Sequence, residues 1–491
     1  MRLPFNTLKT VHFIGIGGIG MSGIAEILSN LNYPVQGSDQ NINNNTSRLQ
    51  KMGITIFIGH DVNNIKNADV VVVSSAIKED NPELLAAHAL GIPVIKRAEM
   101  LAEIMRFRFS IAVAGTHGKT TTTSMNAALL DSANLDPTVV NGGILNSYNT
   151  NAKLGKGEWI VVESDESDGS FTKLPSTIGI ITNIDPEHME HYGTFDNLKA
   201  AFLKFIDNLP FYGLAILCID HPVVLEMTKN IKNKRFMTYG FSENAEIRAT
   251  NLRTSSKGTT FDVDICLKKE TTCLNAKESV VFLPKRYKDL FLPMVGAHNV
   301  QNFLSCIAVA LELNIDEDII RQALSTFKGV KRRFTHVGES KGITIIDDYA
   351  HHPVEIETVL KAAKQCEPNR IIAVVQPHRY SRVKDLMEEF SNSTKLADCV
   401  ALTQIYTAGE EPIEGVNSTV LADMMRKQGQ TVFEINDQKE LPLIIARIAQ
   451  KGDYVVCMGA GSITTWAANL PLQLEQMEFD DPFTFNQAMG R

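Results

Sequence analysis

The sequence predicts an α/β protein of three domains. Its 491 residues suffice for three hydrophobic cores at about 150 residues per domain. Short β-rich runs alternate with helical patterns in three separate series, and a glycine-rich loop follows the first strand of the first two series. Boundaries drawn where the patterns change give domains at 1–107, 108–330 and 331–491.

The composition indicates a globular protein that acts on small molecules. Hydrophobic residues make up 44% of the chain and charged residues 21%, which is ordinary for such proteins. The net charge of −8 argues against a nucleic-acid-binding surface. Because no apolar run approaches the length of about 18 residues that a membrane helix needs, we expect no insertion into a membrane.

The cysteines and the N-terminus indicate a cytoplasmic protein. Met1–Lys9 has no charged region followed by a long apolar stretch, so we expect no secretory signal. The seven cysteines form no CxxC pair, and several lie inside apolar runs. We therefore expect buried, reduced thiols at Cys218, Cys266, Cys273, Cys306, Cys366, Cys399 and Cys457.

The first series predicts a parallel, Rossmann-like domain. Its expected elements are strands at Val11–Ile14, Val35–Ser38 and Val70–Ser74 and helices at Ile19–Leu31 and Pro82–Leu90. The loop Gly15–Gly20 matches GxGxxG, and Asp39 follows the next strand near the spacing of a ribose-binding acid. The motif alone suits NAD, the diphosphate of a UDP sugar, or a glycine turn that only permits close packing.

The second series contains a phosphate-binding loop, the P-loop, at residues 114–121 (AGTHGKTT). It lies between the predicted strand Ser110–Val113 and the predicted helix Thr120–Ala133. Backbone N–H groups and Lys119 would bind phosphate, and Thr120 would bind Mg²⁺. The usual pattern GxxxxGK(S/T) requires glycine at position 113, which is Val113, so the loop is a variant; a chance turn is the alternative.

The rest of the second series continues the β–α alternation and then changes character. Strands are expected at Trp159–Val162 and Ile178–Thr182, and Glu163 at the end of the first could meet the P-loop magnesium. Between about 245 and 295, alternating residues with a turn at 255–258 predict antiparallel strands appended to the domain. Helices follow at Asn299–Leu313 and Asp316–Phe327, the second with Asp316 as its N-cap.

The third series predicts a C-terminal Rossmann-like α/β domain. Its expected elements are strands at Ile343–Ile346, Ile371–Val375, Cys399–Thr403 and Tyr454–Met458 and a helix at Val354–Lys364. The asparagine-rich stretch Asn41–Asn45 and the tail beyond Pro471 show weak periodicity. We expect a solvated loop and a frayed end there.

Four motifs give the chain a family resemblance. Residues 114–121, VVESDESD at 161–168, TNIDPEH at 182–188 and GAHNVQN at 296–302 occur in the order found in the Mur ligases of bacterial cell-wall synthesis, which the chain resembles. GIGGIGMSG at 15–23, DDYAHHP at 347–353 and QPHRYSR at 376–382 are similar to those of the members that join L-alanine to UDP-N-acetylmuramate. The resemblance covers nearly the whole chain.

The resemblance implies an ATP- and Mg²⁺-dependent ligase. The first domain would hold the UDP sugar, the central domain ATP, and the third the amino acid. The lactyl carboxylate of UDP-N-acetylmuramate would become an acyl phosphate, which the amine of L-alanine attacks. We expect no nucleic-acid partner and a monomer or weak homodimer.

Three alternatives remain at this stage. A recycling ligase would attach a whole tripeptide to the same UDP sugar. An NAD-dependent oxidoreductase would use Gly15–Gly20 but would leave the P-loop unexplained. A noncatalytic nucleotide-binding regulator would keep its biological activity after Lys119→Ala.

The residues that we expect to bind ATP and metal ions are inferred from the P-loop and from the resemblance. Lys119, His188 and Arg333 are the expected catalytic residues, with Arg332 as an alternative to Arg333. His188 would serve a second Mg²⁺, whereas Phe202 stands where several sister ligases carry a carbamylated lysine, so no such lysine is expected. The ATP contacts would come from Gly115, Thr116, His117, Gly118, Lys119, Thr120, Thr121, Asn299 (adenine) and Asp348 (ribose), and the metal ligands from Thr120, Glu163 and His188.

Residues for the other substrates are expected in the outer domains. The UDP diphosphate would contact Gly17, Gly18, Ile19, Gly20 and Ser22, with Asp39, His60, Ser74 and Arg97 as weaker candidates for uridine or sugar. Tyr349 and His351 would face the amino acid, and Arg379 with Arg382 could form a fork for its carboxylate, although an exposed basic loop is the alternative.

Several other polar residues allow a structural interpretation. His298 and Asn302 share one face of a predicted helix, where capping would also explain a histidine. A solvated acidic edge is favoured over metal ligation for most of Asp165, Glu166, Asp168 and Glu187.

Overall fold

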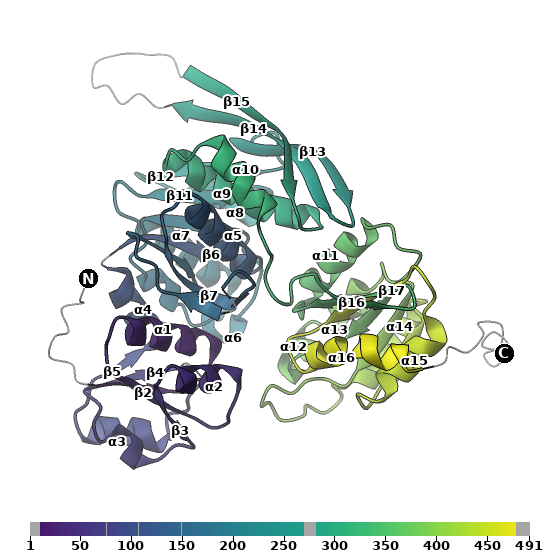
Figure 1. The fold of residues 1–491 in the computed structure, drawn as a ribbon, viewed down its shortest axis with the longest axis horizontal. Helices are drawn as coiled ribbons and strands as arrows, with labels where there is room; N and C mark the ends of the chain where they lie inside the picture. Colours follow the sequence, from purple (N-terminus) through teal and green to yellow (C-terminus); the bar gives the residue numbers. More distant parts are fainter. Residues whose placement is uncertain (1–9, 75, 107, 149, 270–280, 478–491) are drawn as a thin grey trace. The chain divides into compact units, whose positions relative to one another are not determined.

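The structure is a computed structural model, which describes residues 10–477 apart from 75, 107, 149 and 270–280. The chain forms two compact units (Figure 1). The first comprises Met1–Asn251, Phe261–Phe291 and Val300–Val330, and the second Leu252–Thr260, Leu292–Asn299 and Lys331–Arg491. None of the helices in the described part of the chain combines the length and the hydropathy of a membrane span.

The N-terminal sheet is parallel and Rossmann-like, as predicted, and its strand order is β3-β2-β1-β4-β5. Its strands are β1 (Val11–Ile14), β2 (Val35–Asp39), β3 (Thr55–Ile58), β4 (Val70–Val73) and β5 (Val94–Lys96). The helices are α1 (Ile19–Asn30), α2 (Asn44–Lys51), η1 (Val62–Ile65), α3 (Pro82–Ala89) and α4 (Arg97–Met105). The central strand β1 is buried along its whole length, so the loop after it lies at the carboxyl edge of the sheet.

The central sheet has ten strands in the order β15-β14-β13-β12-β11-β10-β6-β9-β7-β8. Its nucleotide half contains β6 (Phe109–Ala114), β7 (Thr138–Leu145), β8 (Thr150–Lys153), β9 (Trp159–Glu163), β10 (Ile178–Ile181), β11 (Leu214–Cys218) and β12 (Arg235–Gly240). The helices around it are α5 (Lys119–Ser132), η2 (Ser170–Lys173), α6 (Met189–Tyr192), α7 (Phe195–Asp207), α8 (Pro222–Thr228), α9 (Ala297–Glu312) and α10 (Glu317–Ser325).

The appended strands predicted between 245 and 295 continue this same sheet. They are β13 (Ile247–Ser255), β14 (Gly258–Lys269) and β15 (Val281–Leu292). Strand β12 pairs with β13 in parallel, and a short turn joins β13 to β14 where the sequence predicted one. Their alternating residues therefore form an extension of the nucleotide-binding sheet.

The C-terminal sheet has the order β16-β17-β21-β18-β19-β20. Its strands are β16 (Thr335–Ser340), β17 (Ile343–Asp348), β18 (Ile371–Val375), β19 (Cys399–Thr403), β20 (Val432–Ile435) and β21 (Tyr454–Met458). All pairs except β16 with β17 are parallel. The helices are α11 (Pro353–Lys364), α12 (Tyr380–Asp385), α13 (Met387–Ser393), α14 (Ser418–Lys427), α15 (Glu440–Ile448) and α16 (Ile463–Glu475).

Two expectations about irregular segments are wrong in part, since residues 41–43 lie before helix α2 and are exposed, and residues 478–491 of the tail lie outside the described residues. The asparagine-rich stretch starts helix α2, because the Asn43 side chain accepts hydrogen bonds from Asn45 N and Thr46 N in a capping box. Helix α16 continues through Pro471 to Glu475, with Leu470 and Leu474 buried in the core. In both places a cap or tertiary packing outweighs the weak local periodicity.

Two smaller expectations are corrected. Asp316 is the N-cap of α10, but its side chain makes no capping hydrogen bond. The described cysteines are free, yet Cys266 is exposed and two others are half-buried, so not all are core thiols. Cys273 lies outside the described residues.

Candidate active site

The P-loop connects β6 to α5 and is shaped by the motif that follows β10. Thr116 Oγ1 and His117 N each donate to Asn183 Oδ1 over 2.7 Å, and Thr182 Oγ1 donates to His117 O over 2.7 Å. Gly115 has φ +132°, and a Cβ there would lie 2.1 Å from Thr182 Oγ1. Only glycine therefore fits where the two motifs meet.

Lys119 is the first residue of α5, and oxygens of three residues surround its ammonium group. Nζ donates to Gly115 O (2.6 Å), Thr116 O (3.0 Å) and Glu166 Oε1 (2.9 Å). Burial lowers the pKa of Lys119, but the Glu166 and Glu163 carboxylates outweigh it and hold that pKa above its usual value. The group is a permanent cation at the N-terminus of a helix, as phosphate binding requires.

Thr120 and Glu163 bring two oxygen ligands together beside the P-loop. Thr120 Oγ1 donates to Glu163 Oε1 over 3.0 Å, and Gly142 N donates to Glu163 Oε2 over 2.5 Å. Strand β9 lies next to β6, so that Glu163 pairs with Val113 in register. A hydroxyl and a carboxylate oxygen are ligands that suit Mg²⁺, and the pair fits the predicted first metal site.

His188 lies among carboxylates on the loop before α6. Its Nε2 is 3.9 Å from Glu166 Oε1 and 3.8 Å from Glu187 Oε2, and its Nδ1 is 3.6 Å from the exposed Glu190. These contacts make His188 the centre of a second polar cluster in the first unit. Phe202, at the position of the sister ligases' lysine, is fully buried with its ring 5.0 Å from that of Phe171.

The expectation of a solvated acidic edge is wrong for Glu166. Its side chain is 1% exposed, whereas that of Asp165 is 45% exposed and pairs with Arg97. Burial alternates in the segment that follows β9: Ser164 and Glu166 are buried, whereas Glu163 and Asp165 are partly exposed. A period of two could have identified Glu166 from the sequence, but its partner Lys119 is 47 residues away.

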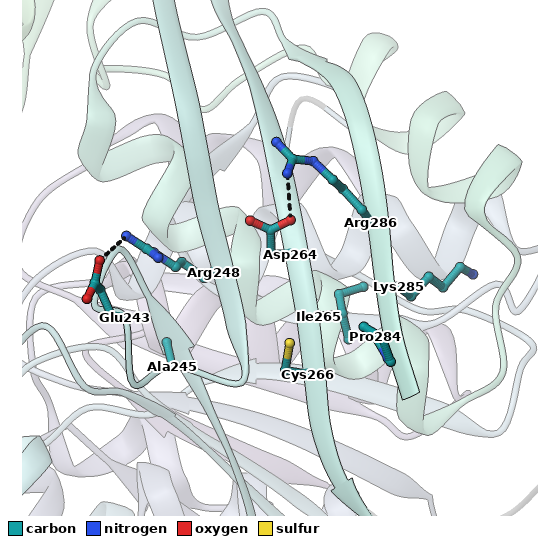
Figure 2. A pocket seen from close by; sticks show the side chains of 9 residues that line it. All are labelled: Glu243, Ala245, Arg248, Asp264, Ile265, Cys266, Pro284, Lys285 and Arg286. Atoms are coloured by element: carbon teal, nitrogen blue, oxygen red, sulfur yellow. Dashed lines mark hydrogen bonds and ion pairs between the residues drawn. The ribbon is translucent and has the colours of Figure 1, made fainter. Parts of the chain in front are cut away.

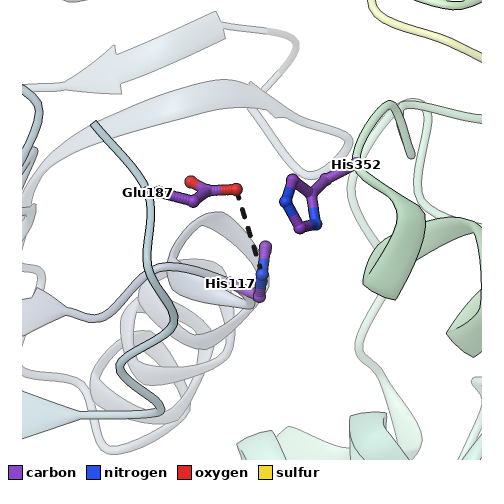
Figure 3. A group of neighbouring side chains, drawn as sticks. All are labelled: His117, Glu187 and His352. Atoms are coloured by element: carbon purple, nitrogen blue, oxygen red, sulfur yellow. Dashed lines mark ion pairs between the residues drawn. The ribbon is translucent and has the colours of Figure 1, made fainter. Parts of the chain in front are cut away.

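The side chain of His117, in the P-loop, lies among carboxylates of the motif that follows β10. Figure 3 shows its ring facing the Glu187 carboxylate, and Nε2 lies 3.4 Å from Asp185 Oδ2 and 4.0 Å from Glu187 Oε1. Asp185 also lies 3.3 Å from His221 Nε2. Burial raises the pKa of Asp185, but the two histidines outweigh it and hold that pKa well below its usual range.

The first glycine loop is held by the end of strand β2. Gly15 N donates to Ser38 O over 2.8 Å, and Gly17 N donates to Asp39 Oδ2 over 2.8 Å. Ile19, at the start of α1, is 45% exposed, whereas the buried Ser22 hydroxyl donates to Ile19 O over 3.0 Å. Asp39 thus contacts the glycine loop itself, and the Ser22 hydroxyl is hydrogen-bonded to the backbone of its own helix.

The weaker candidates for uridine or sugar contacts in the N-terminal domain have different surroundings. Arg97 Nη2 donates to Asp165 Oδ2 over 3.1 Å, and a Cβ at Gly20 would lie 3.0 Å from Arg97 Nη1, so this guanidinium lies against the start of α1. Ser74 lies beside Gly15. His60 instead points inward, with Nδ1 3.1 Å from Ser38 Oγ and 3.4 Å from Glu83 Oε2.

In the second unit, Asp348 ends strand β17 in a buried position. It accepts hydrogen bonds from Phe334 N and Ala350 N, each over 2.7 Å, and burial raises its pKa to about 6. Asn299 is also buried, and its Nδ2 donates to Val295 O over 2.7 Å. Burial, aided by Arg333, lowers the pKa of His298 to about 4, so this histidine is neutral at pH 7.

The two linker arginines have different environments. Arg332 donates to the carbonyls of Gly459 and Ala460, and its guanidinium carbon lies 4.7 Å from the centre of the Tyr349 ring. The guanidinium carbon of Arg333 lies 5.5 Å from the same ring. The backbone of the C-terminal unit therefore holds Arg332, which favours Arg333 as the phosphate ligand.

The predicted amino-acid residues form an aromatic and basic cluster. The His351 ring lies 5.2 Å from that of Tyr349 and 5.6 Å from that of His378, and His378 Nδ1 is 3.4 Å from Arg382 Nη1. Burial, with the nearby cations, lowers the pKa of His378 to about 3, so this ring stays neutral beside Arg382. The prediction omitted His378, although the motif that carries both arginines contains it.

Arg379, in the turn next to this cluster, has an unusual backbone conformation. It has φ +70°, and its N donates to Tyr406 O over 2.9 Å, which fixes the turn before α12. The Tyr406 ring stacks on His378 at 5.5 Å, and no motif in the sequence pointed to it. A strained residue at such a turn is a common feature of ligand-binding loops.

A separate pocket of about 450 Å³ lies on the extension β13–β15. Figure 2 shows two ion pairs among its side chains: Arg248 with Glu243 (3.4 Å) and Arg286 with Asp264 (3.4 Å). None of the motif residues lines this pocket, so the chemistry of the motifs lies elsewhere.

We expect Gly118→Ala to weaken both the fold and ATP binding. Gly118 has φ +80°, and a Cβ there would lie 2.8 Å from Asn302 Oδ1. The strain alone costs about 1–2 kcal/mol, and either the Asn302 side chain or the loop must shift to make room for the Cβ. Thermal unfolding and calorimetry with a non-hydrolysable ATP analogue measure the two effects. Gly193→Ala is the control, because Gly193 has φ +72° with no atom within 4 Å of its Cβ position; equal losses in both variants would contradict the role of the contact.

Family models match most of the chain. The Mur ligase family catalytic domain matches residues 10–109, the Mur ligase middle domain residues 113–310, and the Mur ligase glutamate ligase domain residues 332–461. A relative from Brucella anthropi named UDP-N-acetylmuramate–L-alanine ligase is 53% identical, covering 97% of this chain and 99% of the relative.

Solved structures show the same architecture. A UDP-N-acetylmuramate–alanine ligase from Thermotoga maritima is 30% identical with a TM-score of 0.78, and the match covers 94% of this chain and 98% of that one. A murein peptide ligase from Psychrobacter arcticus has a TM-score of 0.68 at 23% identity, covering 96% and 99%. The second likeness concerns the fold alone.

Proposed function

The chain belongs to the Mur ligase family, and on that premise we propose that it joins L-alanine to the lactyl carboxylate of UDP-N-acetylmuramate at the expense of ATP. We infer the two substrates from the likeness to the Brucella anthropi enzyme, which extends over 97% of the chain. The family is one of ligases, which argues against the nicotinamide-dependent oxidoreductase that the first glycine loop alone allowed.

The geometry of the P-loop supports the phosphoryl-transfer step. Lys119 is a buried cation that can neutralise the phosphate charge, and Thr120 with Glu163 offers oxygen ligands beside it. Thr120 and Glu163 would hold one Mg²⁺ and His188 a second, and Mg²⁺ would supply charge neutralisation of the phosphates. Arg333 would add a further cation at the γ-phosphate.

The reaction needs no nucleophile from the protein. A lactyl carboxylate oxygen bonds to the γ-phosphorus while the bond to the ADP oxygen breaks, giving an acyl phosphate. The alanine amine then attacks the acyl carbon, and the tetrahedral intermediate loses inorganic phosphate and a proton to leave the amide. The protein therefore acts by positioning and by charge.

Substrate contacts are proposed in three regions, within domains bounded at 1–107, 108–330 and 331–491. The glycine loop before α1 and the first residues of that helix, from Gly17 to Gly20, would hold the UDP diphosphate. Asn299 and Asp348 would contact the adenosine of ATP. The alanine carboxylate would pair with Arg379 and Arg382, whose guanidinium forks match its two oxygens. We place the reaction in the cytoplasm, where ATP is available.

The decisive experiment is an acceptor test. Phosphate release from Mg-ATP is measured with UDP-N-acetylmuramate and either no acceptor, L-alanine or the tripeptide L-Ala-γ-D-Glu-diaminopimelate, and mass spectrometry identifies the product. We expect turnover with L-alanine only. Turnover with the tripeptide only would make this a recycling ligase, and turnover with neither would reject both substrates.

A further inference from the structure

We propose that His221 is a positioning residue of the ATP site, which acts on the P-loop through Asp185 and His117. The inference rests on the proposed function in one respect, since it takes residues 114–121 as the loop that binds the phosphates of ATP. It adds to that function a residue that none of the sequence motifs contains, and the contacts through which this residue affects ATP binding.

The Asp185 carboxylate lies between two histidines from different segments of the chain. Oδ1 lies 3.3 Å from Nε2 of His221, the residue before helix α8, and Oδ2 lies 3.4 Å from Nε2 of His117 in the P-loop. Burial raises the pKa of Asp185, but the two histidines outweigh it, so this group is an ionised carboxylate. Because a carboxylate only accepts hydrogen bonds, His221 donates its Nε2–H to Asp185.

Asp185 also supports the backbone of the P-loop. Its N–H donates to Thr116 Oγ1 over 3.0 Å, while its side chain contacts the next residue of the loop, His117. The main chain and the side chain of one residue therefore hold two consecutive residues of the loop. The residues on either side of this pair are Gly115 (φ +132°) and Gly118 (φ +80°), which have no side chains to anchor. The contacts of Thr116 and His117 therefore help to fix the shape of the loop before phosphate binds.

The contacts of His221 point to this role and not to another. His221 is the N-cap residue of α8, but its side chain makes no capping hydrogen bond. Its Nδ1 is buried without a hydrogen-bond partner, so Asp185 is the only partner of this ring among the residues that the structure describes. A histidine that is hydrogen-bonded to a single carboxylate orients that carboxylate, as the outer partners of ligand-binding groups do.

The loss of His221 should therefore weaken ATP binding. Oδ1 of Asp185 would lose its donor, and the carboxylate, which is 26% exposed, could turn toward water. The imidazole of His117 would then lose a partner with a fixed position. ATP itself would have to order the loop, and the free energy of that ordering would be subtracted from the free energy of binding.

Two replacements of His221 that differ in reach test the proposal. Glutamine can place an amide N–H near the position of Nε2, whereas the shorter asparagine can place one only near that of Nδ1. Isothermal calorimetry on the full chain with Mg²⁺ and adenylyl imidodiphosphate, a non-hydrolysable ATP analogue, measures the dissociation constant. We expect about tenfold weaker binding in His221→Asn and nearly wild-type binding in His221→Gln. His88→Ala, an exposed change in helix α3, should leave the constant unaffected.

A double-mutant cycle tests the contacts through which His221 acts. If its effect passes through Asp185 to the imidazole of His117, then His221→Ala/His117→Ala should bind the analogue as His117→Ala does. Additive losses in the double variant would overturn the proposal. Equal affinities of His221→Asn and His221→Gln would also overturn it, and equal falls in their melting temperatures would then assign His221 to the fold alone. Since binding requires no turnover, failure of the L-alanine assay would leave these affinities interpretable.

Discussion

Replacing Lys119 by methionine is expected to lower kcat by about 10²–10³-fold or more, because the variant lacks the buried cation that stabilises the transferring phosphoryl group. The same change leaves Glu166, 1% exposed, without its partner charge. Removing one member of a buried ion pair costs about 3–5 kcal/mol of stability. Phosphate release with L-alanine measures the first effect, and urea unfolding measures the second.

The double variant Lys119→Met/Glu166→Gln separates the two effects. Neutralising Glu166 removes the uncompensated buried charge, so the free energy of unfolding should return most of the way to the wild-type value. The rate should stay low, because no cation remains at the end of α5. Recovery of both would mean that Lys119 serves the fold and not the chemistry.

The sequence predicted the bounds of several buried strands well because these strands are covered on both faces of their sheets. Strands β1, β18, β19 and β21 have the predicted bounds, since a parallel strand covered on both faces is a continuous apolar run. Strands β3 and β5 escaped prediction: they are short and partly exposed, and their pairing depends on neighbours far along the chain. Helix α2 escaped because capping by Asn43 stabilises it more than any apolar stripe.

In the candidate site, too, the sequence predicted some residues and contacts but not others. Lys119, Thr120 and Glu163 were predicted because each follows from its position on a loop or at the end of a strand. Contacts between residues that are far apart in the sequence could not be derived. Examples are Glu166 with Lys119, Arg97 with Asp165, and Tyr406 with His378. Such pairs depend on which strands become neighbours, and no local pattern contains that information.

Arg333→Met and Arg332→Met are expected to have opposite consequences. Arg333 supplies a charge to the γ-phosphate in the proposed reaction, so its loss should lower kcat by about 10³-fold. The melting temperature should hardly change, because the guanidinium of Arg333 contacts the Tyr349 ring and is only half-buried. Arg332 binds the carbonyls of Gly459 and Ala460, so its loss should cost about 1–3 kcal/mol of stability.

Differential scanning calorimetry and single-turnover phosphate release distinguish these effects. Arg333→Lys is the matched control: it keeps the charge but not the planar fork, so it should recover part of the rate. If Arg332→Met instead abolished phosphate release at an unchanged melting temperature, the roles of the two arginines would be reversed. The backbone carbonyls of the second unit argue against that reversal, because a guanidinium that is already bonded to Gly459 and Ala460 must break those bonds before it can reach a phosphate.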